Sequence, residues 1–176
     1  MCRWLAYRGR PVLMEALVTQ PDHSLIAQSL RADECKAVTN GDGFGVGWYG
    51  ERAEPGLFRD VRPAWSDENL RAICAHVRSG LFFAHVRATT GSAVSRANCH
   101  PFSQGRHMFM HNGQIGGFEK IKRRVEAMIP DELYGARLGS TDSEAIFLIA
   151  LANGLDADPV RAMAATLAQI AALMQA

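Results

Sequence analysis

The sequence predicts an α+β fold whose sheet is mostly antiparallel. Its candidate strands and helices come in unequal groups that do not alternate, whereas a doubly wound parallel sheet requires a regular alternation of the two. The chain has 176 residues, of which 48% are hydrophobic and 21% are charged, a composition typical of a globular protein. No internal repeat, charge block or Pro/Ser-rich linker divides it, so residues 1–176 are expected to form a single domain.

Short apolar runs bounded by turn residues predict four strands. These runs are Arg3–Tyr7, Val46–Tyr49, Leu81–Arg87 and His107–His111. The first is expected to end before Gly9-Arg10-Pro11, because glycine and proline mark turns.

Apolar residues at helical spacing predict five helices. These helices cover Ser24–Leu30, Asp67–His76, Phe118–Ile129, Asp142–Asn153 and Pro159–Gln175. Pro130 is expected to stop the third helix, and Pro159 suits the first turn of the last one.

Charge and composition exclude several classes of protein. The net charge is +1, with Lys and Arg spread among acids, so nucleic acid and membrane surfaces are not expected partners. The start of the chain lacks the apolar core of a signal peptide, and no later run of about 18 apolar residues appears.

The four cysteines are widely spaced and form no Cys-x-x-Cys pair, which argues against a zinc site and against a disulfide scaffold. A cytoplasmic location with reduced thiols is therefore expected. Cys35, Cys74 and Cys99 are predicted to be buried packing residues.

Cys2 is the most informative residue of the chain. Removal of Met1 would leave a thiol and a free α-amine on one residue. An α-amine has a pKa near ~8, so at neutral pH a useful fraction can accept the proton of a nearby nucleophile. This combination lets an N-terminal cysteine attack amide carbons.

Two further segments carry groups that such a reaction requires. Arg87 ends an apolar strand and can form two hydrogen bonds with a carboxylate, although pairing with an internal acid would also explain it. Asn112-Gly113 ends another strand. This pair is either a simple turn or an oxyanion hole made by the Asn112 side-chain amide and the Gly113 N–H.

Asp142 opens a predicted helix, where Thr141 and Glu144 have the spacing of a capping box. An acid in the first turn is favoured by the helix dipole, so Asp142 has a complete structural explanation. Its functional alternative is a carboxylate that binds a substrate ammonium group.

Two other patterns are rejected as sites. Gly45-x-Gly47-x-x-Gly50 matches the dinucleotide fingerprint, but Pro55 and Gly56 follow too early for a long phosphate-facing helix. The six histidines invite a Cys–His dyad or a metal site, yet they show no metal-ligand spacing, so no metal is expected.

Five motifs, taken in order, resemble the class II glutamine amidotransferases, which remove ammonia from glutamine with an N-terminal nucleophile. The motifs lie within residues 2–150 and are Cys2, His85-x-Arg87, Asn98-x-His100-Pro101, His111-Asn112-Gly113 and Thr141-Asp142-x-Glu144. The resemblance implies a four-layer αββα sandwich of antiparallel sheets between helices.

The resemblance also implies a role for each site residue. Cys2 is the expected nucleophile, with its own α-amine as base, and Asn112 with Gly113 forms the expected oxyanion hole. Arg87 is expected to bind the substrate α-carboxylate and Asp142 the α-ammonium group. Thr90 keeps a threonine of the family's substrate site, whereas Gly91 stands where histidine is common.

The start of the chain and Asp42-Gly43-x-Gly45 are most similar to the free-standing members of the family. These include the γ-glutamyl hydrolase of ergothioneine biosynthesis. The expected substrate is therefore glutamine or a γ-glutamyl amide. No synthetase segment accompanies the domain, so an ammonia acceptor is expected only on another chain, and no cofactor is implied.

Besides Gly91, the length of the chain after Asp142 also departs from the family pattern. Only 34 residues follow Asp142 and they read as helix, whereas the family draws further strands from this region. The C-terminal part is therefore expected to be incomplete, which would leave unpaired strand edges.

Three functional readings follow. The first is a cysteine amidohydrolase, and the second is a non-catalytic glutamine-binding or regulatory relative with the same pocket. The third is a Cys–His thiol hydrolase of another family or a redox protein.

Overall fold

The structure is a computed structural model that describes residues 2–30, 40–89 and 93–175. The chain divides into two units, Met1–Asn112 and Gly113–Ala176. The expectation of a single domain over residues 1–176 stays a prediction. Strands pair in antiparallel fashion throughout the described part, so the predicted α+β class is confirmed.

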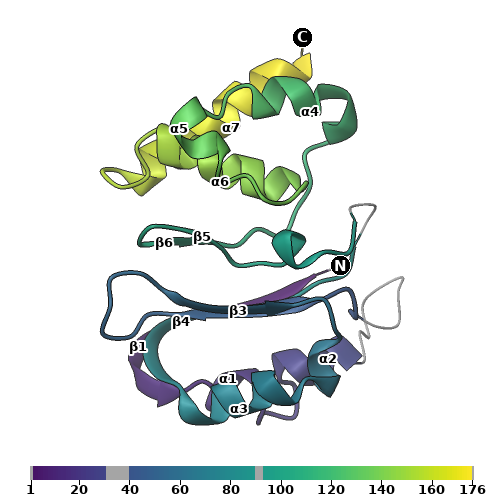
Figure 1. The fold of residues 1–176 in the computed structure, drawn as a ribbon, viewed down its shortest axis with the longest axis vertical. Coiled ribbons are helices and arrows are strands. Elements are labelled where there is room, and N and C mark those ends of the chain that lie inside the picture. Colours follow the sequence, from purple (N-terminus) through teal and green to yellow (C-terminus); the bar gives the residue numbers. More distant parts are fainter. Residues whose placement is uncertain (1, 31–39, 90–92, 176) are drawn as a thin grey trace. The chain divides into compact units, whose positions relative to one another are not determined.

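The first unit is built on a four-stranded sheet with the strand order β1-β4-β2-β3 (Figure 1). The strands are β1 (Arg3–Leu13), β2 (Phe44–Trp48), β3 (Gly56–Asp60) and β4 (Arg78–Val86). The register pairs Arg3 with Val86 across β1 and β4, and Val86 with Phe44 across β4 and β2.

The first strand is longer than predicted. It continues through Gly9-Arg10-Pro11 to Leu13, with a shift of register between Arg8 and Val12. An edge strand tolerates proline, because a missing N–H on the outer side breaks no ladder bond. β3 was not predicted, since five residues with two charges carry too little pattern without the pairing to β2.

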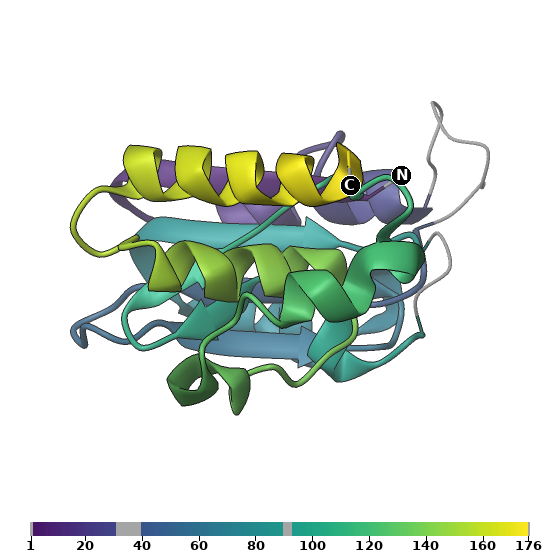
Figure 2. The same ribbon diagram turned by 90° about the horizontal axis from the view of Figure 1, so that it is seen from above.

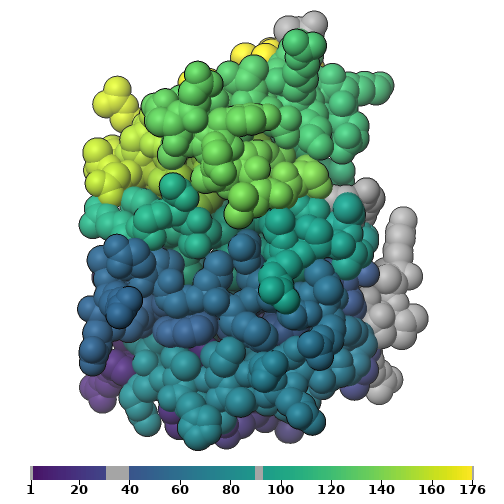
Figure 3. All heavy atoms as spheres, viewed as in Figure 1, coloured from purple at the N-terminus to yellow at the C-terminus, as the bar shows by residue number. Residues whose placement is uncertain are grey.

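Three helices cover one face of this sheet (Figure 1). They are α1 (Glu15–Val18), α2 (Leu25–Leu30) and α3 (Glu68–His76), the last two close to the predicted helices. Asp67 caps α3 by accepting a hydrogen bond from the Leu70 N–H at 2.7 Å. On the face that Figure 3 shows, the atoms of the first unit leave no open gap between the sheet and these helices.

The core of the first unit lies on the helix-covered face. Alternate residues of the central strands point into it, since neighbouring side chains of a strand face opposite sides. Its buried members are Met14, Val18, Leu25, Ile26, Phe44, Val46, Ala64, Leu70, Cys74, Phe82, Ala84 and Val86. Cys74 and Cys99 are fully buried, as predicted, whereas Cys35 lies outside the described residues.

The opposite face of the sheet carries a hairpin of β5 (Phe102–Gln104) and β6 (His107–Phe109) (Figure 1). Gly45 and Gly47 of β2 allow this approach. A Cβ on Gly47 would lie 2.5 Å from the Met108 Sδ, and one on Gly45 would overlap the carbonyl of His100. The two glycines thus serve packing, and β3 follows them, so the dinucleotide reading stays rejected.

The second unit consists of helices. They are α4 (Phe118–Glu126), α5 (Asp131–Tyr134), α6 (Asp142–Ala152) and α7 (Pro159–Gln175). Helix α6 contacts each of the other three, and Figure 2 shows α7 running beside it. Every residue from Asp142 to Ala150 is buried, and from Ala145 onward the helix is apolar on all sides, which agrees with this burial. Within the described ranges, no helix is long and apolar enough to cross a membrane.

Candidate functional site

Cys2 lies directly before β1, and its partly buried thiol contacts the backbone at the end of β4. The Sγ donates to the Ala88 carbonyl at 3.5 Å, and the Ala88 N–H donates to the Sγ at 3.4 Å. The antiparallel pairing of β1 with β4 produces this contact between residues 86 positions apart. The thiol therefore contacts the residue that follows Arg87 in the chain.

Arg87 is buried, with 3% of its surface exposed. Its guanidinium donates to the Asp42 carbonyl at 3.4 Å, to the Thr89 Oγ1 at 3.3 Å and to the Ala93 carbonyl at 3.2 Å. These three acceptors are uncharged. A carboxylate that replaced one of them would form a shorter, charge-assisted bond.

Asp42 organises the chain around this arginine, although no role was predicted for it. Its Oδ2 accepts the Thr89 N–H at 2.8 Å, and its own N–H donates to the Arg87 carbonyl at 3.2 Å. Asp42 thus forms hydrogen bonds with Arg87 and with Thr89, the residues on either side of Ala88. The motif Asp42-Gly43-x-Gly45 was the only sequence signal for this position.

Asn112 contacts Cys2 directly. Its exposed side-chain amide donates through Nδ2 to the main-chain carbonyl of Cys2 at 3.2 Å, across 110 positions of sequence. The first unit therefore brings Cys2, Arg87 and Asn112 together, three of the predicted site residues. Gly113 follows Asn112 in the chain, and it is exposed.

Asp142 begins α6 in the second unit, and its side chain is bonded to backbone. The Oδ2 accepts the Ile115 N–H at 2.7 Å, and the Oδ1 accepts the Ser143 N–H at 2.8 Å and the Ser143 Oγ–H at 3.3 Å. Asp142 thus ties the segment after Gly113 to the start of α6. Thr90, the remaining predicted substrate-binding residue, lies outside the described residues.

The predicted capping box at this helix is only half formed. Thr141 Oγ1 accepts the Glu144 N–H at 3.3 Å, as expected. The Glu144 carboxylate, however, accepts from Arg137 at 2.6 Å and from the N–H groups of Leu138 and Gly139. The buried arginine competes successfully because a charged donor forms the stronger hydrogen bond.

A pair of buried histidines lies behind the site and was missed as a pair. His85 and His100 stack with their ring centroids 4.4 Å apart, and neither ring nitrogen of either residue has a hydrogen-bond partner within the described ranges. Burial lowers the pKa of His85 to about 3, with a further contribution from Arg87. Burial likewise lowers the pKa of His100 well below its ordinary value.

This pair predicts acid sensitivity. The unfolded chain binds a proton on each histidine below pH ~6.5, whereas folded His85 stays neutral down to about pH 3. The free energy of unfolding should therefore fall as the pH drops below about 6.5, by up to about 1.4 kcal/mol per pH unit for each histidine. Urea unfolding at pH 7.5, 5.5 and 4.5 measures this slope.

His85→Phe should reduce that slope by up to about 1.4 kcal/mol per pH unit, the contribution of one proton. Phenylalanine keeps the stacked ring and cannot titrate. His23→Phe, which makes the same replacement at an exposed position, is the matched control. An unaltered slope in His85→Phe would show that His85 is not the group responsible.

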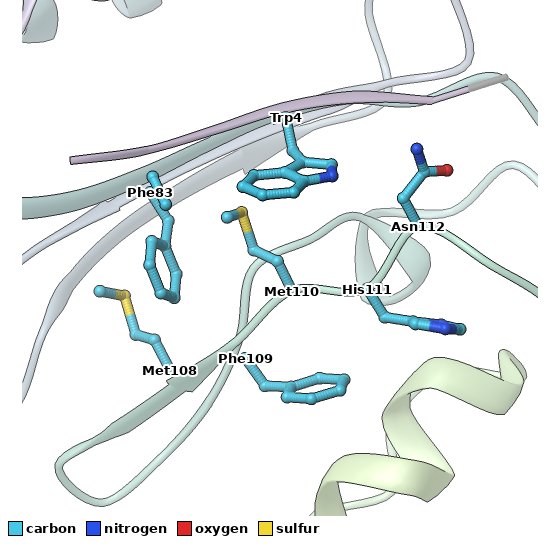
Figure 4. A pocket seen from close by; sticks show the side chains of 8 residues that line it. Trp4, Phe83, Met108, Phe109, Met110, His111 and Asn112 are labelled. Atoms are coloured by element: carbon cyan, nitrogen blue, oxygen red, sulfur yellow. The ribbon is translucent and has the colours of Figure 1, made fainter.

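An apolar pocket of about 390 Å³ lies on the same face of the sheet as Cys2. Its walls are Trp4 and Ala6 of β1, Phe83 of β4, Met108 of β6, and Met110. Figure 4 shows these side chains around the pocket. It was not predicted, because its walls come from three separate strands.

The polar end of this pocket is formed by His111 and Asn112 (Figure 4). Because the Asn112 amide also donates a hydrogen bond to the Cys2 carbonyl, the pocket opens beside Cys2. The described residues contain no group of three or more His, Cys, Asp or Glu side chains able to hold a metal ion.

Comparison with known proteins identifies the family. The family described as glutamine amidotransferases class-II matches residues 14–176, so the chain belongs to the class II glutamine amidotransferases. The solved glutamine aminotransferase class-II domain protein of Silicibacter pomeroyi superimposes with a TM-score of 0.72 at 43% sequence identity. That match covers 96% of this chain and 63% of the other. The resemblance and the fold class predicted from the sequence are thereby confirmed.

Two curated relatives extend the comparison. The chain is 44% identical over 161 residues to the probable glutamine amidotransferase DUG3 of Saccharomyces cerevisiae, a match that covers 86% of this chain and 45% of the yeast protein. It is 29% identical over 175 residues to the γ-glutamyl-hercynylcysteine sulfoxide hydrolase of Mycolicibacterium smegmatis, covering 98% of this chain and 70% of that protein. The chain therefore spans less than half of the yeast relative's length.

Proposed function

We propose that this chain cleaves the γ-amide of glutamine or of a γ-glutamyl amide through a thioester on Cys2. The observation that carries the proposal is the convergence around one thiol in the first unit. The Sγ of Cys2 contacts Ala88, the residue after buried Arg87, and Asn112 bonds the Cys2 carbonyl. A nucleophile, a cation and an amide donor are the groups that the reaction requires.

The proposed chemistry begins when Met1 is removed and the α-amine of Cys2 becomes free. The amine accepts the thiol proton, and the sulfur attacks the γ-carbonyl carbon of the substrate. The Asn112 amide and the Gly113 N–H donate to the oxyanion of the tetrahedral intermediate. The amine then returns the proton to the leaving nitrogen, and a γ-glutamyl thioester remains. Water hydrolyses the thioester to glutamate and restores the thiol. None of these steps needs a cofactor.

Substrate binding is assigned to three residues. Arg87 binds the α-carboxylate by exchanging one of its neutral acceptors, and Thr90 supports the same end of the substrate. Asp142 binds the α-ammonium group, for which it retains acceptor capacity. Its Oδ2 accepts one hydrogen bond from Ile115, and a carboxylate oxygen can accept two.

The relatives support this substrate class without deciding between its members. One is named as a hydrolase of a γ-glutamyl compound and another as a probable glutamine amidotransferase. If the released ammonia is transferred to an acceptor substrate, that acceptor is bound by a partner protein. If the leaving group is a larger amine, no acceptor is required.

The labelling of Cys2 by a glutamine analogue tests the proposal. An analogue with a diazo ketone at its γ position should form one covalent adduct, at Cys2, in protein that lacks Met1. Buried Cys74, whose pKa is raised to about 12, should not react. Intact mass spectrometry before and after exposure, followed by peptide mapping, gives both results.

Arg87→Lys should slow this labelling by about tenfold or more, because lysine cannot form two parallel hydrogen bonds with the carboxylate. Arg8→Lys, on an exposed position of β1, is the matched control and should label at the normal rate. Equal rates in both variants would count against the carboxylate-binding role. Processed protein with no adduct would favour the non-catalytic relative considered above.

A further inference from the structure

The apolar pocket beside Cys2 has a size and a lining that ammonia does not need. It holds about 390 Å³ and is lined by aromatic and thioether side chains, among them Trp4, Phe83, Met108 and Met110. Such a lining favours aromatic or sulfur-containing groups, through apolar contact and sulfur–aromatic interactions. It thus indicates a ligand with a large apolar part.

The register of the sheet places this pocket on one side of the nucleophile. Trp4 pairs with His85 and Ala6 with Phe83, so moving along β1 from Cys2 leads away from Arg87 at the end of β4. Cys2, Trp4 and Ala6 alternate with Leu5 and Tyr7, which pack into the helix-side core. Trp4 and Ala6 therefore share the other face of β1, and Cys2, directly before the strand, continues the same alternation. Trp4 lies about 7 Å and Ala6 about 13 Å along the chain from Cys2.

We propose that this pocket binds the amine half of a γ-glutamyl amide whose amine carries an aromatic or thioether side chain. The assignment rests on the proposed function, in which the glutamyl half extends from the thiol toward Arg87. Because Arg87 and the pocket lie in opposite directions along the paired strands, the two halves of the substrate then extend to opposite sides of Cys2. Asn112 lies at the junction, because it lines the pocket and also bonds the Cys2 carbonyl.

Three matched dipeptides test the assignment: γ-Glu-Phe, γ-Glu-Met and γ-Glu-Gly differ only in the side chain that the pocket would receive. With processed wild-type protein, kcat/KM for the first two should exceed that for γ-Glu-Gly by about 10- to 100-fold. Ala6→Leu fills the pocket and should reduce this ratio at least about tenfold. Ala164→Leu, on an exposed position of α7, adds the same atoms outside the pocket and should preserve the ratio.

A binding measurement keeps this inference separate from catalysis. Calorimetry on Cys2→Ala protein should give the same preference for γ-Glu-Phe over γ-Glu-Gly, and Met110→Ala, which removes one wall, should weaken it. Cleavage of all three dipeptides at equal kcat/KM, unaffected by Ala6→Leu, would overturn the pocket assignment and uphold the proposed function. A binding preference for γ-Glu-Phe without hydrolysis or labelling at Cys2 would uphold the pocket assignment and overturn the proposed function.

The mass of the protein in solution tests whether a second copy of the chain, rather than a substrate group, occupies the pocket. Wild-type protein and Ala6→Leu should have the same mass by light scattering. A wild-type dimer that Ala6→Leu dissociates, with the substrate ratio unchanged, would assign the pocket to a second copy of the chain and overturn the proposal.

Discussion

Replacing Cys2 by alanine should lower the turnover of glutamine and of γ-glutamyl amides by about 10⁴-fold or more. Without the thiol no thioester can form, and only binding and the oxyanion donors remain to accelerate the reaction. Binding of substrate should persist, because Arg87 and Asp142 are unchanged. Glutamate release, measured in parallel with calorimetry, separates the two effects.

Cys74→Ala is the matched control for this variant. Cys74 is fully buried in α3, and its thiol has a pKa raised to about 12 by burial, so it cannot serve as the nucleophile. The control should lose some stability through the cavity it leaves and retain the wild-type rate. A Cys2→Ala protein with full activity would refute the proposed mechanism.

Replacing Arg137 by methionine should lower the free energy of unfolding by about 3–5 kcal/mol. Only 4% of the Arg137 side chain is exposed, and it donates to Glu144 at 2.6 Å and to Glu126 at 2.9 Å. Removing the arginine leaves the buried carboxylate of Glu144 without its counter-charge, which is the costly way to break a buried ion pair. Urea unfolding measures the loss, and hydrogen exchange in α6 localises it to the second unit.

Two further variants make this result specific. Arg123→Met removes an exposed arginine of α4 and should change stability by less than about 0.5 kcal/mol. The double variant Arg137→Met/Glu144→Gln should recover part of the loss, because the buried charge is then absent. If the double variant is no more stable than Arg137→Met alone, the uncompensated charge is not the cause.

The buried arginine also explains why a sequence-based capping box failed. Thr141 and Glu144 have the correct spacing, and the threonine does cap the helix. The glutamate side chain has a stronger partner in Arg137, seven positions earlier in the chain. Local spacing cannot reveal such competition, because it depends on how the segment before α6 folds back.

Much of the secondary structure was predictable because it depends on local patterns. The helices at 25–30, 68–76 and 159–175 lie close to their predicted bounds, since capping residues, proline and apolar spacing act over a few positions. Not every helix was predicted correctly, since the helix expected to run from Phe118 to Ile129 ends at Glu126, and the short α1 and α5 were not expected. The other errors were at strands. β1 continues past its turn-like segment and β3 had no recognisable pattern, because pairing with a neighbouring strand decides both.

The sequence by itself determined the α+β class, the family and the chemical groups offered for catalysis, since these depend on residue types and their order. Only the tertiary structure decided how those groups meet. Strand register brings the Cys2 thiol to Ala88 and the Asn112 amide to Cys2, across 86 and 110 positions. The stacked histidines and the apolar pocket depend on the same pairing, because contacts between distant segments leave no local pattern in the sequence.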